Sequence, residues 1–313
     1  MTLHMMNKKA ENHTSAPAGI RKTVSGEPLI DAPVSKKIET MSGIISAISF
    51  KRGKIETGKF EMRPEMVIVR PEKGSLFAAV RDDHYLIGPG EFILIEPYAP
   101  HILLPGIDDT EPEGEMLCFT ASADPEDKSS TFRVPGSASV LTPEEPHYGE
   151  FVELYETTAG FVSAVDPDPA ARTLPSLFSA HGSLELLCSY LDEHLGWDYV
   201  QTEIAASWPI LEKPVRFICE NLQNDISLGE ITEHSQLSTY YCAHKFREVF
   251  GDTIMRCVLR LRLGKSLALL VQSTKSISEV AACCGFSSLT TFCTVFKKRY
   301  GHSPMTMRRM KMR

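Results

Sequence analysis

The feature that most constrains the fold of this chain is an internal repeat in its last third, with a period of 50 residues. Four positions of the first copy recur in the second: Ser238 as Ser288, Phe246 as Phe296, Phe250 as Tyr300, and Gly251 as Gly301. Serine is a preferred residue at the start of a helix, and glycine is preferred just after its end. Each copy therefore predicts an amphipathic helix of about three turns between its serine and its glycine.

A shorter helix is expected before each of these two helices. In the second copy an apolar face with the spacing i, i+3, i+4, i+7 is formed by Ile277, Val280, Ala281 and Cys284. Gly285 follows as a turn residue. A helix, a tight turn and a second helix flanked by basic residues is the plan of the helix-turn-helix motif.

The stretch between the two copies predicts one long linker helix. An apolar stripe runs along it through Leu259, Leu263, Leu267, Leu270 and Val271. About 18 helical residues extend about 27 Å, so two motifs joined in this way can enter successive major grooves roughly 34 Å apart. Gly264 costs about 1 kcal/mol relative to alanine inside a helix, and we expect it to allow close packing against a neighbour.

The charge is divided unevenly along the chain. Residues 212–313 contain 16 Lys and Arg against 8 Asp and Glu, a net charge of +8. The whole chain carries −7, which leaves −15 for residues 1–211. A basic segment attached to an acidic one indicates that the basic part meets a polyanion, although basic surfaces also serve solubility alone.

The eight cysteines are interpreted as packing residues. Six of them lie after residue 211, and they form no C-x-x-C pair and are followed by no histidine at a zinc-like spacing. Cys284 takes a core position next to Cys283, and no metal or cofactor is predicted. No run approaches 18 apolar residues and no signal-peptide pattern is present, so we expect a cytoplasmic protein without a membrane segment.

The first two thirds predict a different architecture. Residues 1–40 are polar and without a sustained period, which favours a disordered tail. Residues 42–120 contain short β-type runs such as "EMVIVRP" and "EFILIEP" between Gly, Pro and Asp clusters, which indicate an antiparallel sandwich or barrel. The segment "GEFVELYE" is interpreted as a further strand, and residues 196–214 as a connection.

An apolar stripe with helical spacing lies near the end of this region. Leucines and a cysteine recur with helical spacing at Leu184, Leu187, Cys188, Leu191 and Leu195. Such a stripe is usually a core face, and the alternative is the seam of a homodimer. The four leucines are the residues to which we assign dimerisation.

The two helix-turn-helix motifs of the last third resemble those of a known family. The stretch "SISEVAACCGFSSLTTFCTVFKKRYGHSP" resembles the second helix-turn-helix signature of the AraC/XylS transcription regulators, and the resemblance extends over Pro214 to Arg308, including Arg262 of the linker. The first copy departs from the family pattern in having Thr232 in place of alanine, Gln236 in place of a turn glycine and Lys245 in place of an apolar residue. The second departs at Leu289, where a polar residue is usual, and at Thr294, where an arginine is common.

The resemblance implies which side chains face DNA. Base-facing positions would be Tyr240, Ala243 and His244 in the first motif, and Leu289, Thr290, Thr291, Cys293 and Thr294 in the second motif. Phosphate contacts would come from Arg247, Lys297, Lys298 and Arg299, which position a protein without specifying a sequence. Ordinary solvent-exposed surface is the alternative for each of these residues.

The N-terminal half resembles, more diffusely, the cupin-like barrel that precedes the DNA-binding unit in many members of this family. Metal-dependent cupins need an H-x-H motif, whereas this region has only the separate His84 and His101. The predicted architecture is therefore α+β: a cupin-like antiparallel β-barrel with following helices over residues 41–200, then an all-α domain of two helix-turn-helix motifs over residues 208–313.

Together these observations predict a sequence-specific, DNA-binding transcriptional regulator and no catalytic residues. We expect an activator that binds double-stranded promoter DNA at the bacterial nucleoid, works with RNA polymerase and forms a homodimer. Its N-terminal domain would sense a small molecule or a protein partner, dimerise, or both. The alternatives are a cupin enzyme fused to a DNA-binding domain, and a regulator controlled by partners or oligomerisation alone.

Overall fold

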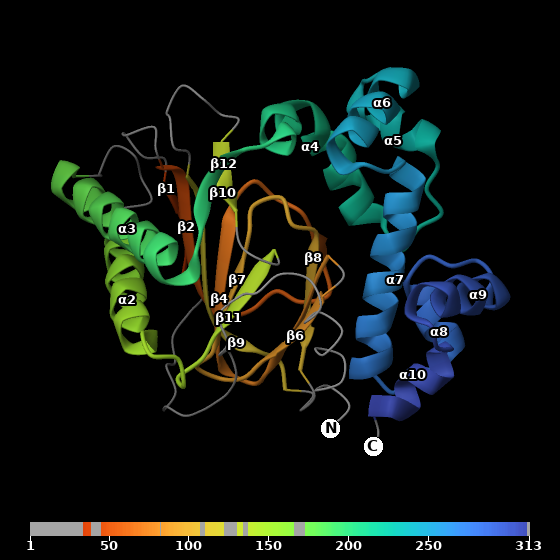
Figure 1. The fold of residues 1–313 in the computed structure, drawn as a ribbon, viewed down its shortest axis with the longest axis horizontal. Helices are drawn as coiled ribbons and strands as arrows, with labels where there is room; N and C mark the ends of the chain where they lie inside the picture. The colour runs from red at the N-terminus through yellow and green to blue at the C-terminus, as the bar shows by residue number, and fades with distance from the viewer. Residues whose placement is uncertain are drawn as a thin grey trace. The chain divides into compact units, whose positions relative to one another are not determined.

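The computed structural model describes residues 34–38, 45–81, 83–106, 110–121, 130–133, 137–165 and 173–311. They form two compact units, of which one ends at Glu212 and the other begins at Lys213 (Figure 1). The tail predicted for residues 1–40 lies outside the described residues, except for β1 (Val34–Ile38), which pairs with β2 as a strand.

A six-stranded antiparallel sheet forms the centre of the N-terminal unit. Its strands, in spatial order, are β1, β2 (Ile45–Lys54), β9 (Glu113–Ala121), β4 (Met66–Lys73), β7 (Phe92–Ile95) and β11 (Ala138–Leu141). A four-stranded sheet packs on one face, in the order β3 (Phe60–Glu61), β8 (His101–Pro105), β5 (Leu76–Val80) and β6 (Asp83–Ile87). A small third sheet pairs β10 (Ser130–Arg133) with β12 (Asp198–Gln201).

The antiparallel sheets that the sequence predicts are present, but a closed cupin-like barrel is not confirmed. Within the described residues the six-stranded and four-stranded sheets are separate, and no strand pairing closes them into one. The β12 strand and the helix that follows it occupy the stretch interpreted as a mere connection over residues 196–214.

The central sheet is buried on both faces because side chains alternate along its strands. On β4, Met66 and Ile68 belong to one apolar cluster, whereas Val67 and Val69 belong to the other. The second cluster lies between the two larger sheets. Buried strands of this kind read as continuous apolar runs, which explains the "MVIV" segment of the sequence.

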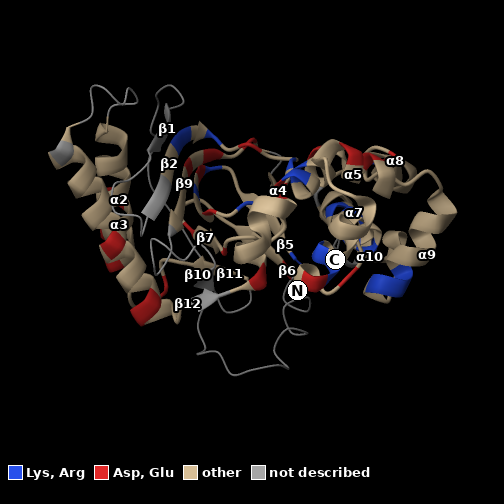
Figure 2. Ribbon diagram, turned by 90° about the horizontal axis from the view of Figure 1, so that it is seen from above, with Lys and Arg blue, Asp and Glu red and all other residues tan. Residues whose placement is uncertain are grey.

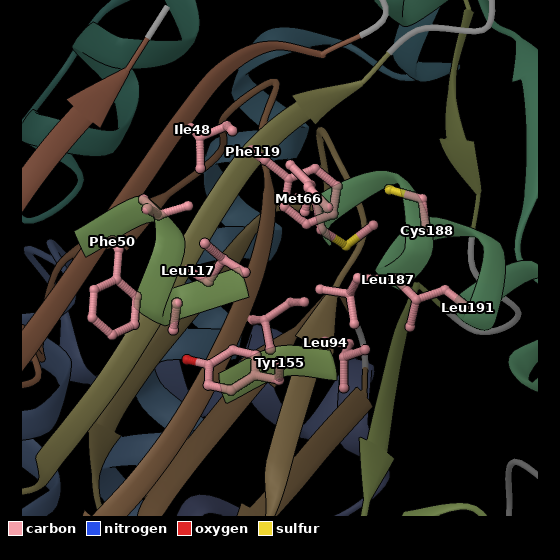
Figure 3. Close-up of a cluster of buried hydrophobic side chains, with 14 of the residues drawn as sticks. Ile48, Phe50, Met66, Leu94, Leu117, Phe119, Tyr155, Leu187, Cys188 and Leu191 are labelled. Atoms are coloured by element: carbon pink, nitrogen blue, oxygen red, sulfur yellow. The ribbon is translucent and has the colours of Figure 1, made fainter. Parts of the chain in front are cut away.

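Two helices, α2 (Tyr148–Ala164) and α3 (Leu174–Leu195), cover the other face of the central sheet (Figure 1). Their side chains meet those of the strands in one cluster, in which Tyr155, Leu187 and Leu191 face Phe119 and Leu94 (Figure 3). The ring of Phe92 contacts Tyr155 edge-on at a centroid distance of 4.9 Å. The core of the unit therefore has three layers: helices, sheet, sheet.

The strand expected at "GEFVELYE" is wrong, because these residues lie in α2. Eight residues are too few to separate the two periods, but the longer stretch shows the helical one. Phe151, Tyr155, Ala159 and Val162 are spaced by three or four positions, and all are buried against the sheet.

The leucine stripe of α3 packs within the chain. Leu184, Leu187 and Leu191 are fully buried in the cluster between α3 and the sheet, and Leu195 packs on its edge. The structure thus corrects the dimerisation assignment, because side chains enclosed by their own chain present no surface to a second copy. The face of α3 that remains exposed carries Phe178 and Leu186.

The C-terminal unit is helical. Its elements are the end of α4 (Glu203–Asn221), then α5 (Leu228–Ser235), α6 (Thr239–Phe250), α7 (Ile254–Gln272), α8 (Ile277–Cys283), α9 (Leu289–Tyr300) and α10 (Pro304–Lys311). The linker helix predicted between the repeats is α7. No helix in the described part of the chain has the length and apolar character needed to cross a bilayer.

The role predicted for Gly264 is wrong. A Cβ atom built on this residue would have no heavy atom of a neighbour within 4 Å. The glycine therefore permits no close approach, and it lies in the interior of α7 without a packing reason that the structure reveals.

Candidate DNA-binding surface

The two helices of the sequence repeat, α6 and α9, begin and end in the same way. The hydroxyl of Ser238 accepts a hydrogen bond from the backbone N–H of Tyr241 at 3.2 Å, and Ser288 accepts one from Thr291 at 3.3 Å. Gly251 ends α6 and Gly301 ends α9, both in the left-handed conformation. The predicted helix starts and stops are confirmed.

The shorter helices α5 and α8 share a feature that the sequence analysis missed. Each begins with a capping box, in which serine and a glutamate three residues later satisfy each other's backbone N–H groups. The pairs are Ser227 with Glu230 and Ser276 with Glu279. The S-x-x-E pattern in the sequence is the signal that could have revealed both.

Each repeat helix has one buried and one exposed side. Phe292 and Phe296 of α9 are fully buried, and their rings contact each other at a centroid distance of 5.4 Å. Cys242 and Phe246 take the equivalent places on α6. The hydrophobic anchors thus fix which side of each helix faces solvent.

All the residues predicted to face DNA lie on the solvent side. Tyr240 is 81% exposed and Leu289 is 46% exposed, which is unusual for such large apolar side chains. The others are exposed or half-buried: Ala243, His244, Arg247, Thr290, Thr291, Cys293, Thr294, Lys297, Lys298 and Arg299. The structure gives their positions, and their contacts with DNA remain predictions.

Two side chains on α6 stack along the helix. The rings of Tyr240 and His244 lie one turn apart with a centroid distance of 6.0 Å and an interplanar angle of 29°. His244 also has its Nδ1 atom 3.9 Å from Glu248. The exposed start of α6 is therefore aromatic, whereas that of α9 consists of a leucine and threonines.

Basic side chains lie toward the C-terminal ends of the repeat helices. Lys297, Lys298 and Arg299 form the last turn of α9 (Figure 2), and Arg247 lies in the last turn of α6. Cations are favourable there because the helix dipole places negative potential at that end. They are equally suited to the phosphates of a nucleic acid.

The departures from the family pattern in the first motif are accommodated locally. The buried hydroxyl of Thr232 donates to the backbone carbonyl of Gly229 at 3.0 Å, so no polar atom is left without a partner. Lys245 is half-buried, and its Nζ atom reaches Glu248 at 3.0 Å. Gln236 adopts φ +58°, a left-handed conformation that glycine would adopt without strain.

The turn of the second motif packs against the linker helix. Gly285 has φ +77°, and a Cβ atom on it would lie 2.9 Å from Nε of Arg262. The guanidinium of Arg262 donates to the carbonyl groups of Leu222 at 2.9 Å and of Asn224 at 2.6 Å. The turn of the second motif and the segment before the first therefore share one anchor.

Four of the eight cysteines are buried, as expected of packing residues, and the other four are half-buried or exposed. Cys284 is fully buried, and burial raises the pKa of its thiol to about 12, so it stays protonated and unreactive. Its neighbour Cys283 is exposed. Cys118, Cys188 and Cys242 are buried as well.

The two histidines considered for a cupin metal site lie in the four-stranded sheet, on the strands that flank β5. His101 is buried, with Nδ1 2.8 Å from the carbonyl oxygen of Ala99 and Nε2 3.7 Å from Glu61. Burial opposes ionisation of Glu61, but its interactions with the nearby His101 and Arg63 lower its pKa to about 2. Glu61 thus forms a half-buried ion pair with Arg63 beside the buried ring of His101.

The repeat region is similar to known DNA-binding regulators. Residues 231–310 match the protein family described as "Helix-turn-helix domain". Among curated proteins, "Regulatory protein PocR" of Salmonella typhimurium is 33% identical over 98 residues, 31% of this chain and 32% of that protein. "Probable transcriptional regulator LumQ" of Photobacterium leiognathi is 29% identical over 163 residues, 46% of this chain and 66% of that protein. The matches thus span from about a third to just under two thirds of these relatives.

A solved structure from Chromobacterium violaceum, described as a transcriptional regulator of the AraC-type DNA-binding class, is 27% identical. The match covers 34% of this chain and 96% of that chain, with a TM-score of 0.32. The sequence matches and the paired motifs define the C-terminal unit as a double helix-turn-helix domain. This part of the chain is therefore similar to the transcription regulators named above.

Proposed function

We propose that this chain is a sequence-specific transcriptional regulator that binds double-stranded promoter DNA through α6 and α9. One observation carries the proposal: large apolar side chains, Tyr240 and Leu289, are exposed at the starts of two equivalent helices with hydrophobic anchors behind them. A recognition helix contacts base edges through its N-terminal residues. The exposed starts of α6 and α9 would therefore form the two parts of the surface that contacts DNA bases.

In this proposal the two ends of each helix have different roles. Tyr240, His244 and Thr290 lie in the first half, where base contacts are expected. Arg247 and Lys297 lie one to two turns further on and would contact phosphates, which positions the protein without specifying sequence. The 19-residue α7 is about 28 Å long, which suits two successive major grooves.

The test is the salt dependence of binding, measured by fluorescence anisotropy with the full-length chain and a labelled duplex selected from random sequence. Affinity should fall with a log–log slope of several units, because bound phosphates release counterions. Lys297→Ala should lower the slope by about one and weaken all duplexes alike. Tyr240→Ala should instead change the preferred sequence. A slope near zero, or the absence of binding to duplex DNA, would contradict the proposal.

The N-terminal unit supplies the signal in this proposal. We infer an activator that works with RNA polymerase in the cytoplasm, and whose β-sheet unit responds to a small molecule or protein, dimerises, or both. Its support is the separation of an acidic segment from a basic one. A thermal-shift screen discriminates the routes, because a ligand of the folded state stabilises by RT ln(1 + [L]/Kd). Stabilisation by one chemical class identifies a small-molecule route, whereas a concentration-dependent midpoint identifies dimerisation.

A further inference from the structure

Three side chains with metal-binding atoms meet at one end of the helical layer of the N-terminal unit. His147 precedes α2, Glu150 lies in the first turn of α2, and His194 lies in the last turn of α3. One ligand atom from each lies within 4.8 Å of those of the other two. Over the part of the chain that the structure describes, it is the one such group of three.

The distance between two of the ligand atoms suits a tetrahedrally coordinated ion. With bonds of about 2.0–2.1 Å to nitrogen and oxygen, neighbouring ligand atoms of a tetrahedral zinc site lie about 3.4 Å apart. Nδ1 of His147 lies 3.4 Å from Oε2 of Glu150. His147 and Glu150 are exposed and His194 is half-buried, so side-chain rotations can bring the third ligand to the same distance.

The backbone that carries these ligands is held in place by the neighbouring Tyr190. Its hydroxyl donates to the backbone carbonyl of His147 at 2.8 Å, which ties the start of α2 to the end of α3. Its ring lies 4.5 Å from that of His194, and the two histidine rings stack at 4.3 Å.

We propose that His147, Glu150 and His194 bind one divalent transition-metal ion, with Zn²⁺ as the expected occupant. Two imidazoles and a carboxylate are a ligand set that zinc accepts, and the fourth position would be open to water. The ion would clamp the start of α2 to the end of α3. Because both helices cover the central sheet, bound metal would stabilise the regulatory unit and give it a metal-dependent input.

The test uses the full-length chain, freed of metal with a chelator and titrated with ZnCl₂ in a calorimeter. One ion per chain is expected, together with a rise in the melting temperature of the N-terminal unit. His194→Phe keeps an aromatic ring against Tyr190 but removes the ligand atom, and should weaken Zn²⁺ binding at least tenfold. Glu150→Gln changes one exposed oxygen to an amide and should also weaken it.

The matched control is His181→Ala on the same helix. Nδ1 of His181 lies 3.4 Å from Glu185, the same separation as in the proposed site, but this pair belongs to no group of three among the described residues. Its substitution should leave Zn²⁺ binding unchanged. Equal affinity in the wild type and in folded His194→Phe and Glu150→Gln variants would overturn the proposal, as would the absence of Zn²⁺ binding by the wild type.

Discussion

Nε of Arg262 donates a hydrogen bond to the backbone carbonyl oxygen of Leu222 at 2.9 Å. A methyl group on Gly285 would lie 2.7 Å from that same oxygen. The linker helix, the segment before the first motif and the turn of the second motif therefore meet at one atom. This contact holds the two motifs in a defined relation, and it is where a small change should have a large effect.

Gly285→Ala is expected to destabilise the C-terminal unit. The left-handed conformation alone costs about 1–2 kcal/mol for a residue with a Cβ, and the new methyl group meets backbone and a guanidinium that cannot both move aside. Chemical denaturation of the full-length chain measures the effect. In a double-mutant cycle, Arg262→Ala should relieve part of the cost, and strict additivity would contradict a shared anchor.

Gln236→Gly is expected to have the opposite effect, although it changes the equivalent turn of the first motif. Gln236 is held at φ +58°, where glycine has no steric penalty. The substitution should therefore stabilise the unit by about 1 kcal/mol, the strain removed less the chain entropy that glycine adds. A lower midpoint in urea than that of the wild type would show that Gln236 makes a compensating contact.

Gly264→Ala should also stabilise the protein, by about 1 kcal/mol, because alanine is the better helix former and the new methyl group has open space. The measurement is the shift of the thermal midpoint of the full-length chain. Gly160→Ala is the matched control in the other unit: it also lies inside a helix with nothing within 4 Å. Loss of DNA binding in a stabilised Gly264→Ala variant would indicate a functional bend in α7.

Substitutions of two adjacent leucines in α3 distinguish a role in core packing from a role in dimerisation. Leu187 is fully buried, so Leu187→Glu places a carboxylate in the core and should unfold the N-terminal unit. Leu186 is 61% exposed, and Leu186→Glu should leave the fold intact. If the exposed face of α3 forms a dimer, this variant should halve the mass measured by light scattering. An unchanged dimer in Leu186→Glu would exclude this face from the dimer interface.

The C-terminal unit was the more predictable because its signals are local. Ser288, Phe292 and Gly301 define the start, the buried side and the end of α9 within fourteen residues of sequence. The helix-turn-helix plan follows from such spacings without knowledge of distant contacts. The same holds for α7, where an apolar stripe predicted a helix of nearly the observed length.

The N-terminal unit was less predictable because its structure depends on contacts between distant residues. The stripe containing Leu187 shows that one face of α3 is buried, but not whether it packs on its own sheet or on a partner. The grouping of His147 with His194 arises only when α2 and α3 pack side by side. Neither the order of the strands nor the open edges of the sheets leaves a periodic signal in the sequence.

The α9 helix should read an A·T-rich and loosely specified half-site. Bidentate recognition of guanine needs Arg or Lys, and that of adenine needs Asn or Gln. The face that begins with Leu289 and Thr290 offers methyl and hydroxyl groups instead. The hydroxyl of Thr294 donates to the backbone carbonyl of Thr290 at 2.9 Å, which leaves its methyl group for contact with thymine. Shape and deformability of the DNA would supply much of the discrimination.

Selection from a randomised duplex, followed by sequencing, tests this prediction with the full-length protein. The half-site under Tyr240 and His244 should be strict, and the half-site under α9 should tolerate substitution within a preference for A·T pairs. The alternative is that Arg299 reaches the groove and recognises guanine, in which case Arg299→Ala should abolish a required G·C pair. A required G·C pair that is lost in Thr294→Ala but kept in Arg299→Ala would contradict both, because it would make Thr294 the source of base recognition.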